Sequence, residues 1–345
     1  MSQSHALRVR VAQVIEETAD AYSLVLEPDP ADSARFAYHA GQFLTVRVPT
    51  DRPGGAARCY SLCSSPALGE PLKITVKRTR DGYGSNWICD NVVEGSTLEV
   101  LRPSGTFTPR SFSGDFLLFA AGSGITPVMS ILKSALHSGT GTVTLVYANR
   151  DENSVIFRDE LAELGAKFAD RFIAIHWLES VQGLPNRDAL ALLATGRTGA
   201  NAYVCGPEPF MDAAVAALVT AGLPRERVHV ERFLSLDNDP FADVAVLVDD
   251  GSGTATTVEV TLDGQTTTHA WPAGNHLLDV LLAAGLDAPF SCREGQCSAC
   301  ACKLIEGEVE LDHNEVLEQE DLDDGYRLAC QARAVTASVR VTYDE

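Results

Sequence analysis

The chain has 345 residues, 45% of them hydrophobic and 21% charged, and its 47 acidic and 27 basic residues give a formal net charge of −20. The length predicts two or three domains, and the composition is that of a globular protein rather than a disordered one. The negative charge argues against a protein that binds nucleic acid or adsorbs to an anionic membrane. No run of about 18 apolar residues occurs, so we expect no bilayer-spanning helix. The first ten residues lack the apolar core of a signal peptide, which predicts a cytoplasmic protein.

The charge and the cysteines concentrate in the last third of the chain. Residues 236–345 contain 22 acidic and 5 basic residues, a net charge of −17, whereas residues 1–235 have a net charge of −3. Five of the nine cysteines also lie in this last third, and four of them fall within eleven residues. In a chain with no export signal, such clustering indicates metal binding rather than disulfides.

The first part of the chain consists of short apolar or alternating runs separated by turn residues. We expect strands over 7–15, 22–26, 43–48, 72–76 and 98–101, and a helix near 85–91. Many short strands at this spacing predict a small antiparallel barrel. We place this first domain at residues 1–111.

Beyond it, strands alternate with helices. We expect strands over 116–120, 143–147, 172–177, 202–204 and 228–230, with helices over 127–137, 157–164 and 208–221. Continuous apolar strands alternating with helices predict a parallel sheet covered on both faces. We place this α/β domain at 112–235 and a linker at 236–253.

The last domain, 254–345, contains the strongest motif. Cys292, Cys297 and Cys300 follow the spacing C-x4-C-x2-C, and Cys330 stands 30 positions after Cys300. This is the plant-type spacing of ligands to a [2Fe–2S] cluster. Zinc or a purely structural set of thiols is the alternative, although a structural zinc site more often has two C-x2-C pairs. Cys302 fits no ligand position and is expected in the core.

The order strand, strand, helix and cysteine loop in this domain resembles plant-type ferredoxins. The expected elements are strands over 257–262, 267–271 and 338–343 and a helix over 277–284. The resemblance covers residues 254–345 and implies a β-grasp fold.

The first domain carries the stretch Arg58-Cys-Tyr60-Ser61, which resembles the R-x-Y-S signature of the ferredoxin reductase family. The resemblance implies that Arg58 meets the pyrophosphate of FAD, that Tyr60 packs on the flavin, and that Ser61 lies near its reactive nitrogen. Alone, the signature could also be one exposed face of a strand. A Gly/Ser turn that opens a helix supports the flavin site, because backbone N–H groups and the helix dipole attract phosphate. The further flavin-binding candidates are Val76, Lys77, Gly82, Gly84 and Ser85.

The second domain contains a glycine loop after its first strand. It departs from the dinucleotide fingerprint G-x-G-x-x-G because Pro127 replaces the third glycine. The family resemblance implies that this loop and a second loop, at the end of a later strand, bind the nicotinamide cofactor. The candidates are Gly122, Gly124, Thr126 and Pro127 in the first loop and Cys205, Gly206 and Pro207 in the second.

The resemblance also implies that Glu231 and Phe233 reach back to the flavin. Ser61, Cys205 and Glu231 would then form the hydride-transfer pocket. The alternatives are that Cys205 is a core cysteine and that Glu231 is a charged strand end.

The choice between NADH and NADPH depends on Asn149-Arg150-Asp151, after the second strand of the α/β domain. Arg150 could meet a 2′-phosphate, but Asp151 and the next acidic residue follow it at once. Carboxylates repel phosphate and suit a free ribose hydroxyl. We therefore predict NADH, with NADPH as the alternative.

The order of the three domains resembles the reductase components of bacterial oxygenases with a carboxy-terminal ferredoxin. A nicotinamide gives up two electrons as hydride, a [2Fe–2S] cluster accepts one at a time, and a flavin can do both. The resemblance implies an electron path from NADH through FAD and the cluster to a Rieske non-haem iron oxygenase. It favours an oxygenase that hydroxylates the steroid nucleus, with a phenylacetyl-CoA epoxidase as the alternative. A redox sensor is the alternative of a different class.

The acidic last domain has two interpretations. Its negative surface would steer the protein to a basic patch on the oxygenase. The alternative is an acidic surface that only maintains solubility.

Overall fold

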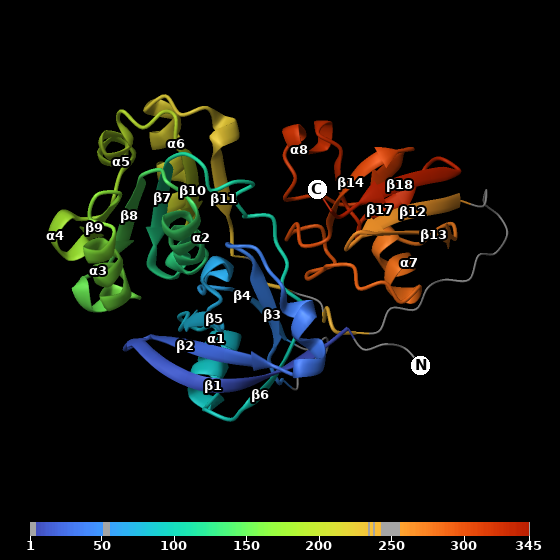
Figure 1. Ribbon diagram of the computed structural model, residues 1–345, viewed down its shortest axis with the longest axis horizontal. Coiled ribbons are helices and arrows are strands. Elements are labelled where there is room, and N and C mark those ends of the chain that lie inside the picture. Colours follow the sequence, from blue (N-terminus) through green and yellow to red (C-terminus); the bar gives the residue numbers. More distant parts are fainter. Residues whose placement is uncertain (1–4, 51–55, 234, 237–238, 243–255, 345) are drawn as a thin grey trace.

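The computed structural model describes residues 5–50, 56–233, 235–236, 239–242 and 256–344. They form three domains, each built on a sheet of five or six strands, and the third domain has a second, two-stranded sheet (Figure 1). Most of the predicted linker, 236–253, lies outside the described residues, and the domain boundaries stay predictions. Within the described part of the chain, no helix is long and apolar enough to cross a bilayer.

The first domain is the predicted antiparallel barrel sheet, with the strand order β4-β3-β6-β1-β2-β5. Its elements are β1 (Leu7–Thr18), β2 (Ala21–Pro28), β3 (Phe43–Arg47), β4 (Ala57–Ser61), β5 (Leu72–Lys77), β6 (Thr97–Val100) and the helix α1 (Tyr83–Asn91). Strand β1 begins with alternating buried and exposed residues, as expected for a strand with one face on the core. Strand β4, which contains the R-x-Y-S signature, was not among the predicted strands.

The second domain is the predicted parallel sheet, with the order β11-β10-β7-β8-β9. Its strands are β7 (Phe116–Ala121), β8 (Val143–Asn149), β9 (Phe172–Leu178), β10 (Asn201–Cys205) and β11 (Val228–Glu231), and its helices are α2 (Ile125–Ser138), α3 (Arg158–Lys167), α4 (Glu179–Gln182), α5 (Arg187–Ala194) and α6 (Glu208–Thr220). Helices α2 and α3 pack in one apolar cluster and α5 and α6 in another. Both faces of the sheet are thus covered, so β7 and β8 are buried along their whole length.

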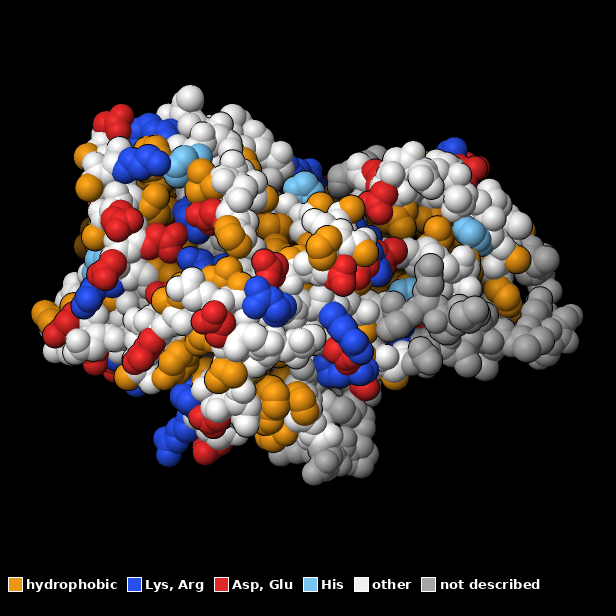
Figure 2. Space-filling model, turned by 60° about the horizontal axis from the view of Figure 1, so that its bottom comes forward, with side chains coloured by type: hydrophobic (Ala, Val, Ile, Leu, Met, Phe, Trp, Pro, Cys, Tyr) orange, Lys and Arg blue, Asp and Glu red, His pale blue; other side chains and the backbone are white. Residues whose placement is uncertain are grey.

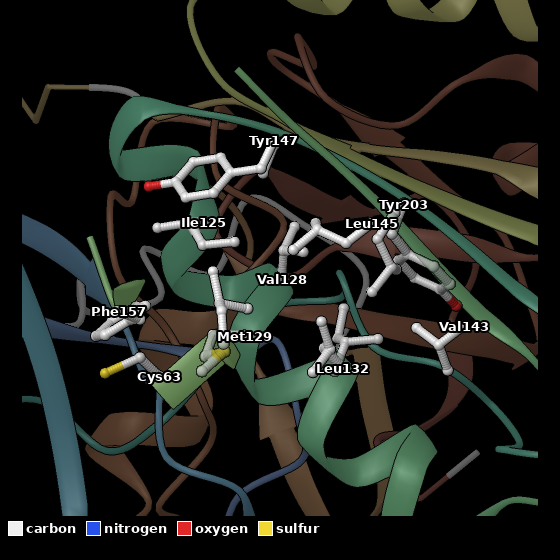
Figure 3. Close-up of a cluster of buried hydrophobic side chains, with 14 of the residues drawn as sticks. Cys63, Ile125, Val128, Met129, Leu132, Val143, Leu145, Tyr147, Phe157 and Tyr203 are labelled. Atoms are coloured by element: carbon white, nitrogen blue, oxygen red, sulfur yellow. The ribbon is translucent and has the colours of Figure 1, made fainter. Parts of the chain in front are cut away.

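Helix α2 joins the second domain to the barrel. Its residues Ile125 and Met129 belong to an apolar cluster that includes Tyr147 of β8 and Cys63 of the barrel (Figure 3). Because α2 begins directly after the glycine loop, this packing fixes the loop relative to the flavin barrel.

The third domain has a five-stranded sheet, β13-β12-β18-β14-β16, and a two-stranded one, β15-β17. Its elements are β12 (Thr256–Leu262), β13 (Gln265–Trp271), α7 (Leu277–Ala283), β14 (Ala301–Glu306), β15 (Val309–Leu311), α8 (Gln319–Asp323), β16 (Tyr326–Leu328), β17 (Ala332–Ala334) and β18 (Ser338–Thr342). The domain contacts the barrel through Asp287, whose carboxylate accepts two hydrogen bonds of 2.8 Å from Arg35. Bidentate pairs of this kind fix orientation as well as proximity.

Candidate redox site

The predicted flavin residues Arg58, Tyr60 and Ser61 lie on β4, beside the start of α1. A Cβ atom at Gly84 would lie 2.7 Å from Cγ of Arg58, so glycine is needed where the helix passes the arginine. The first turn of α1 has no side-chain cap and no acidic residue. The N–H groups at the start of this helix and the Arg58 guanidinium therefore form a cradle that suits a pyrophosphate.

The other predicted flavin residues surround this cradle. Ser85 is buried in α1, and its hydroxyl accepts a hydrogen bond of 3.0 Å from the backbone N–H of Thr79. Lys77 ends β5, and burial lowers the pKa of its ammonium group. Val76 is fully buried in the barrel core, so its side chain serves packing.

The two predicted nicotinamide loops lie against each other at the carboxyl ends of β7 and β10. A Cβ atom at Gly124 would be 2.2 Å from the carbonyl oxygen of Cys205, and one at Gly206 would be 2.9 Å from Cβ of Ala121. Both positions therefore require glycine. Gly122 has a φ of +53°, and α2, with Thr126 and Pro127 in its first turn, begins here without a side-chain cap. Pro207 precedes the first residue of α6 at the second loop. This carboxyl edge is where parallel sheets bind nucleotides.

Cys205 and Glu231 are direct neighbours in register at the ends of β10 and β11. Burial, and then the charge of Glu231, raises the pKa of the Cys205 thiol well above its usual value. Burial also raises the pKa of Glu231 to about 8. At neutral pH both groups therefore carry their protons.

The segment after β11 runs back to the flavin strand. Ser235 forms an antiparallel bridge with Arg58, and the Arg58 guanidinium donates to the carbonyl of Leu236 at 3.3 Å. Ionised Glu231 would raise the pKa of Cys59, the residue after Arg58, so this carboxyl group lies near β4. The structure thus brings β4 together with the predicted pocket residues of β10 and β11. Phe233, in this returning segment, is 48% exposed.

The residues predicted to determine selectivity between NADH and NADPH lie at and directly after the end of β8. Asn149 is buried, whereas the Arg150 side chain is 64% exposed. A hydrogen bond from the Ser154 hydroxyl lowers the pKa of Asp151. At neutral pH Asp151 is therefore a carboxylate beside Arg150.

The four predicted cluster ligands lie together in the third domain. Cys292 and Cys297 form one pair, in which the Cys292 N–H donates to the Cys297 sulfur at 3.3 Å. Cys300 and Cys330 form the other pair, in which the Cys330 N–H donates to the Cys300 sulfur at 3.5 Å. A hydrogen bond from the Cys297 thiol lowers the pKa of Cys292 to about 6, and one from Cys300 lowers the pKa of Cys330.

This two-and-two grouping fits a cluster with two irons. Among the residues that the structure describes, no three His, Cys, Asp or Glu side chains converge on a position for a single ion. Backbone N–H groups of Glu294 and Gln296 donate to the Cys292 sulfur at 3.3 and 3.4 Å. Such donors stabilise thiolates in iron–sulfur sites. Cys302 is buried in the core of the domain, as predicted.

Five residues of this region were not among the predicted site residues: Asp20, Thr45, Cys59, Lys133 and Ser291. Each contacts a residue far away in the sequence, for example Thr45 and Ser291, which are 246 positions apart. Cys59 lies inside the R-x-Y-S signature and Ser291 begins the predicted cysteine loop, whereas no local pattern marks Asp20, Thr45 or Lys133.

Three family models match successive parts of the chain. They are an oxidoreductase FAD-binding domain over residues 7–108, an oxidoreductase NAD-binding domain over 118–216, and a 2Fe-2S iron-sulfur cluster binding domain over 260–335. The predicted fold class and the predicted cofactors FAD, NAD and [2Fe–2S] are confirmed.

The chain is 57% identical over 348 aligned residues to the 3-ketosteroid-9-alpha-monooxygenase, ferredoxin reductase component, of Mycobacterium tuberculosis (strain CDC 1551 / Oshkosh), covering 99% of this chain and 97% of that protein. It is 34% identical to one of the subunits of 1,2-phenylacetyl-CoA epoxidase from Escherichia coli (strain K12), covering 100% and 99%. Among solved structures, phthalate dioxygenase reductase is similar with a TM-score of 0.57 and 28% identity over 98% of both chains. The predicted resemblance to oxygenase reductases with a carboxy-terminal ferredoxin is confirmed.

Proposed function

This chain belongs to the family of ferredoxin reductase components of oxygenases, and on that premise we propose that it delivers electrons from NADH to the Rieske-type terminal oxygenase of a 3-ketosteroid 9α-hydroxylase. The observation that carries the proposal is the 57% identity, over nearly the whole length, to a reductase component named for that system. The phenylacetyl-CoA epoxidase system, whose matching subunit is 34% identical, is the second candidate.

The residues around β4 would perform the first transfer. When bound, FAD supplies the chemistry that takes up a hydride and releases single electrons. Arg58 and the start of α1 would hold its pyrophosphate. Cys205 and Glu231, both protonated at neutral pH, would border the nicotinamide ring without adding a charge beside it. Because they end neighbouring strands, they would hold that ring at a fixed height above the flavin.

The preference for NADH has support in the charges around Arg150. Its guanidinium donates to Asp20 of the barrel at 2.8 Å, and Asp151 follows it in the chain. Two carboxylates at this point would repel the 2′-phosphate of NADPH.

Reconstitution tests the choice of partner. The purified holoprotein would be mixed with NADH and, in separate reactions, with the oxygenase components of a steroid 9α-hydroxylase and of a phenylacetyl-CoA epoxidase. We expect NADH oxidation coupled to hydroxylated steroid. Coupled epoxidation of phenylacetyl-CoA without steroid product would overturn the assignment. A holoprotein that NADH reduces once, with no repeated turnover on ferricyanide, would be a sensor instead.

We propose further that the acidic third domain steers the chain to its oxygenase. Exposed carboxylates lie on β14 and β15 and beyond, at Glu306, Glu308, Glu310 and Glu315. On the face shown in Figure 2, by contrast, acidic and basic side chains of the first two domains are interspersed. The rate of electron delivery to the oxygenase should therefore fall as salt is raised from about 0.05 to 0.5 M. A rate that does not depend on salt would leave solubility as the role of these charges.

A further inference from the structure

Strand β4 has two faces with different surroundings. Side chains alternate along a strand, so Arg58 and Tyr60 share one face, and Ala57 and Cys59 share the other. Tyr60 packs on the barrel core. Ala57 and Cys59 instead pack in a small apolar cluster with two cluster ligands of the third domain, Cys292 and Cys297. The flavin strand is therefore also the wall against which the cluster-binding loop rests.

Three hydrogen-bonding side chains join that wall to the loop. Thr45 of β3 and Cys59 of β4 are directly opposite each other in register. The hydroxyl groups of Thr45 and Ser291 are 2.7 Å apart, and the Cys59 sulfur is 3.3 Å from the Ser291 hydroxyl.

The two hydroxyl groups of this contact belong to buried residues, and Cys59 is half-buried beside them. Thr45 and Ser291 are 0% and 1% exposed. A buried hydroxyl group is tolerated only when it has a partner, and the hydroxyl groups of Thr45 and Ser291 meet across the domain boundary. Separating the two domains would take the Ser291 hydroxyl away from both Thr45 and Cys59, which would keep only their mutual contact of 3.7 Å. The triad of Thr45, Cys59 and Ser291 therefore specifies one docked position of the loop. Two further contacts between the domains support this position: Arg35 donates to the Asp287 carboxylate, and the hydroxyl groups of Thr106 and Ser298 are hydrogen-bonded.

Ser291 immediately precedes the ligand Cys292. Fixing its hydroxyl group fixes the backbone of that ligand, whose side chain is 1% exposed. Electron-transfer rates fall steeply as the distance between donor and acceptor increases, so a loop held against β4 keeps the transfer fast.

We propose that Ser291, held by Thr45 and Cys59, is a positioning residue for electron transfer from the flavin to the cluster. The inference rests on the electron path of the proposed function. In that step the reduced flavin is oxidised by one electron, one ferric ion becomes ferrous, and no covalent bond forms or breaks.

The test uses Ser291→Ala and Cys59→Ala in the holoprotein. Stopped-flow absorbance after mixing with NADH should show flavin reduction within twofold of wild type and cluster reduction slowed about tenfold or more, because small misplacements of reacting groups have large kinetic effects. Turnover with ferricyanide, which takes electrons directly from flavin, should persist while turnover with cytochrome c falls. Cys59→Ser retains a hydrogen-bonding group and should recover most of the rate.

Two further measurements distinguish a misplaced loop from a damaged iron–sulfur cluster. The EPR spectrum of the dithionite-reduced variants should match wild type, and hydrogen exchange of residues 286–298 should be faster. Ser23→Ala is the matched control, because Ser23 forms a buried 2.7 Å hydroxyl pair with Thr75 between strands β2 and β5 of the barrel. Unchanged cluster reduction in both Ser291→Ala and Cys59→Ala would overturn the proposal. A wild-type protein whose cluster NADH does not reduce would overturn the electron path itself.

Discussion

Arg150, at the carboxyl end of β8, donates a hydrogen bond of 2.8 Å to Asp20, which lies in the turn between β1 and β2 of the flavin barrel. The arginine expected beside the ribose thus has a carboxylate from another domain as its partner. Asp20 also lies 3.9 Å from the ammonium group of Lys77. Asp20 therefore offsets positive charge that a 2′-phosphate would need.

Asp20→Asn should make NADPH a better substrate. Without the carboxylate, Arg150 is free to meet the 2′-phosphate, and we expect KM for NADPH to fall about fivefold while KM for NADH changes little. Steady-state kinetics with both nucleotides measure this. Glu27→Gln, which removes the partner of Arg10 elsewhere on the barrel, is the control. Unimproved use of NADPH would show that Asp20 has no part in selectivity.

Lys133→Met should destabilise the contact between the first two domains. Lys133 of α2 is 1% exposed, and its ammonium group lies 2.6 Å from Glu70 and 3.0 Å from Glu160. Removing the cation leaves the partly buried carboxylates of Glu70 and Glu160 without their positive partner, which should lower the free energy of unfolding by about 3 kcal/mol. Thermal unfolding should show a lower midpoint. Adding Glu70→Gln and Glu160→Gln to Lys133→Met should restore part of the loss, and an unchanged midpoint in Lys133→Met would refute the prediction.

Cys297→Ser should remove the iron–sulfur absorption and leave flavin reduction by NADH intact. Arg58 and Tyr60 lie on the face of β4 opposite the one that packs with Cys297, and Cys205 and Glu231 lie in the second domain, so the loss of this ligand should leave them in place. Cys302→Ala, at a buried cysteine outside the ligand set, should retain the cluster. Loss of flavin reduction together with the cluster would contradict the separation of the two sites.

Ser61→Ala should slow hydride transfer without releasing the flavin. Ser61 is 4% exposed at the end of β4. One hydrogen bond contributes about 1 kcal/mol, so we expect a rate of flavin reduction about fivefold to tenfold lower. Stopped-flow reduction by NADH and the flavin content of the purified variant measure the two effects. A rate equal to wild type would remove Ser61 from the pocket.

Glu231→Gln should change how stability depends on pH. Burial raises the pKa of Glu231 from 4.5 to about 8. As pH rises through this window, the unfolded chain loses the proton and the folded chain retains it, so the folded state loses stability, and the loss is complete above about pH 8. The variant has no such proton. We therefore compare the midpoint of thermal unfolding of the variant with that of wild type at each pH. The variant's midpoint minus the wild-type midpoint should be higher at pH 8.5 than at pH 5 by about 3 °C or more.

Glu208→Gln is the control for this measurement. Glu208 is exposed on α6, where it pairs with Arg232. If the thermal midpoints of Glu231→Gln and wild type differ by the same amount at both pH values, Glu231 ionises normally in the folded protein.

The sequence predicted the parallel sheet well because its strands are continuous apolar runs. It did not predict β4, since Arg58, Cys59 and Tyr60 are all half-buried and give no alternating pattern. The short strands of the third domain, such as Val309–Leu311, were missed because three residues are too few to show a period. The spacing of three of the cysteines predicted a group that, with the more distant Cys330, lies together in the third domain. The partners of Arg150 and Ser291 come from other domains, and local patterns contain no information about such contacts.

The two faces of β4 also limit how this segment can vary. In a strand, inserting or deleting one residue turns every following side chain to the opposite face. Such a change before Arg58 would direct Arg58 and Tyr60 at the iron–sulfur domain and move Cys59 to the nucleotide side. Related chains should therefore tolerate substitutions in β4 but maintain its length, and any exchange of the ferredoxin module between reductases would have to preserve this spacing.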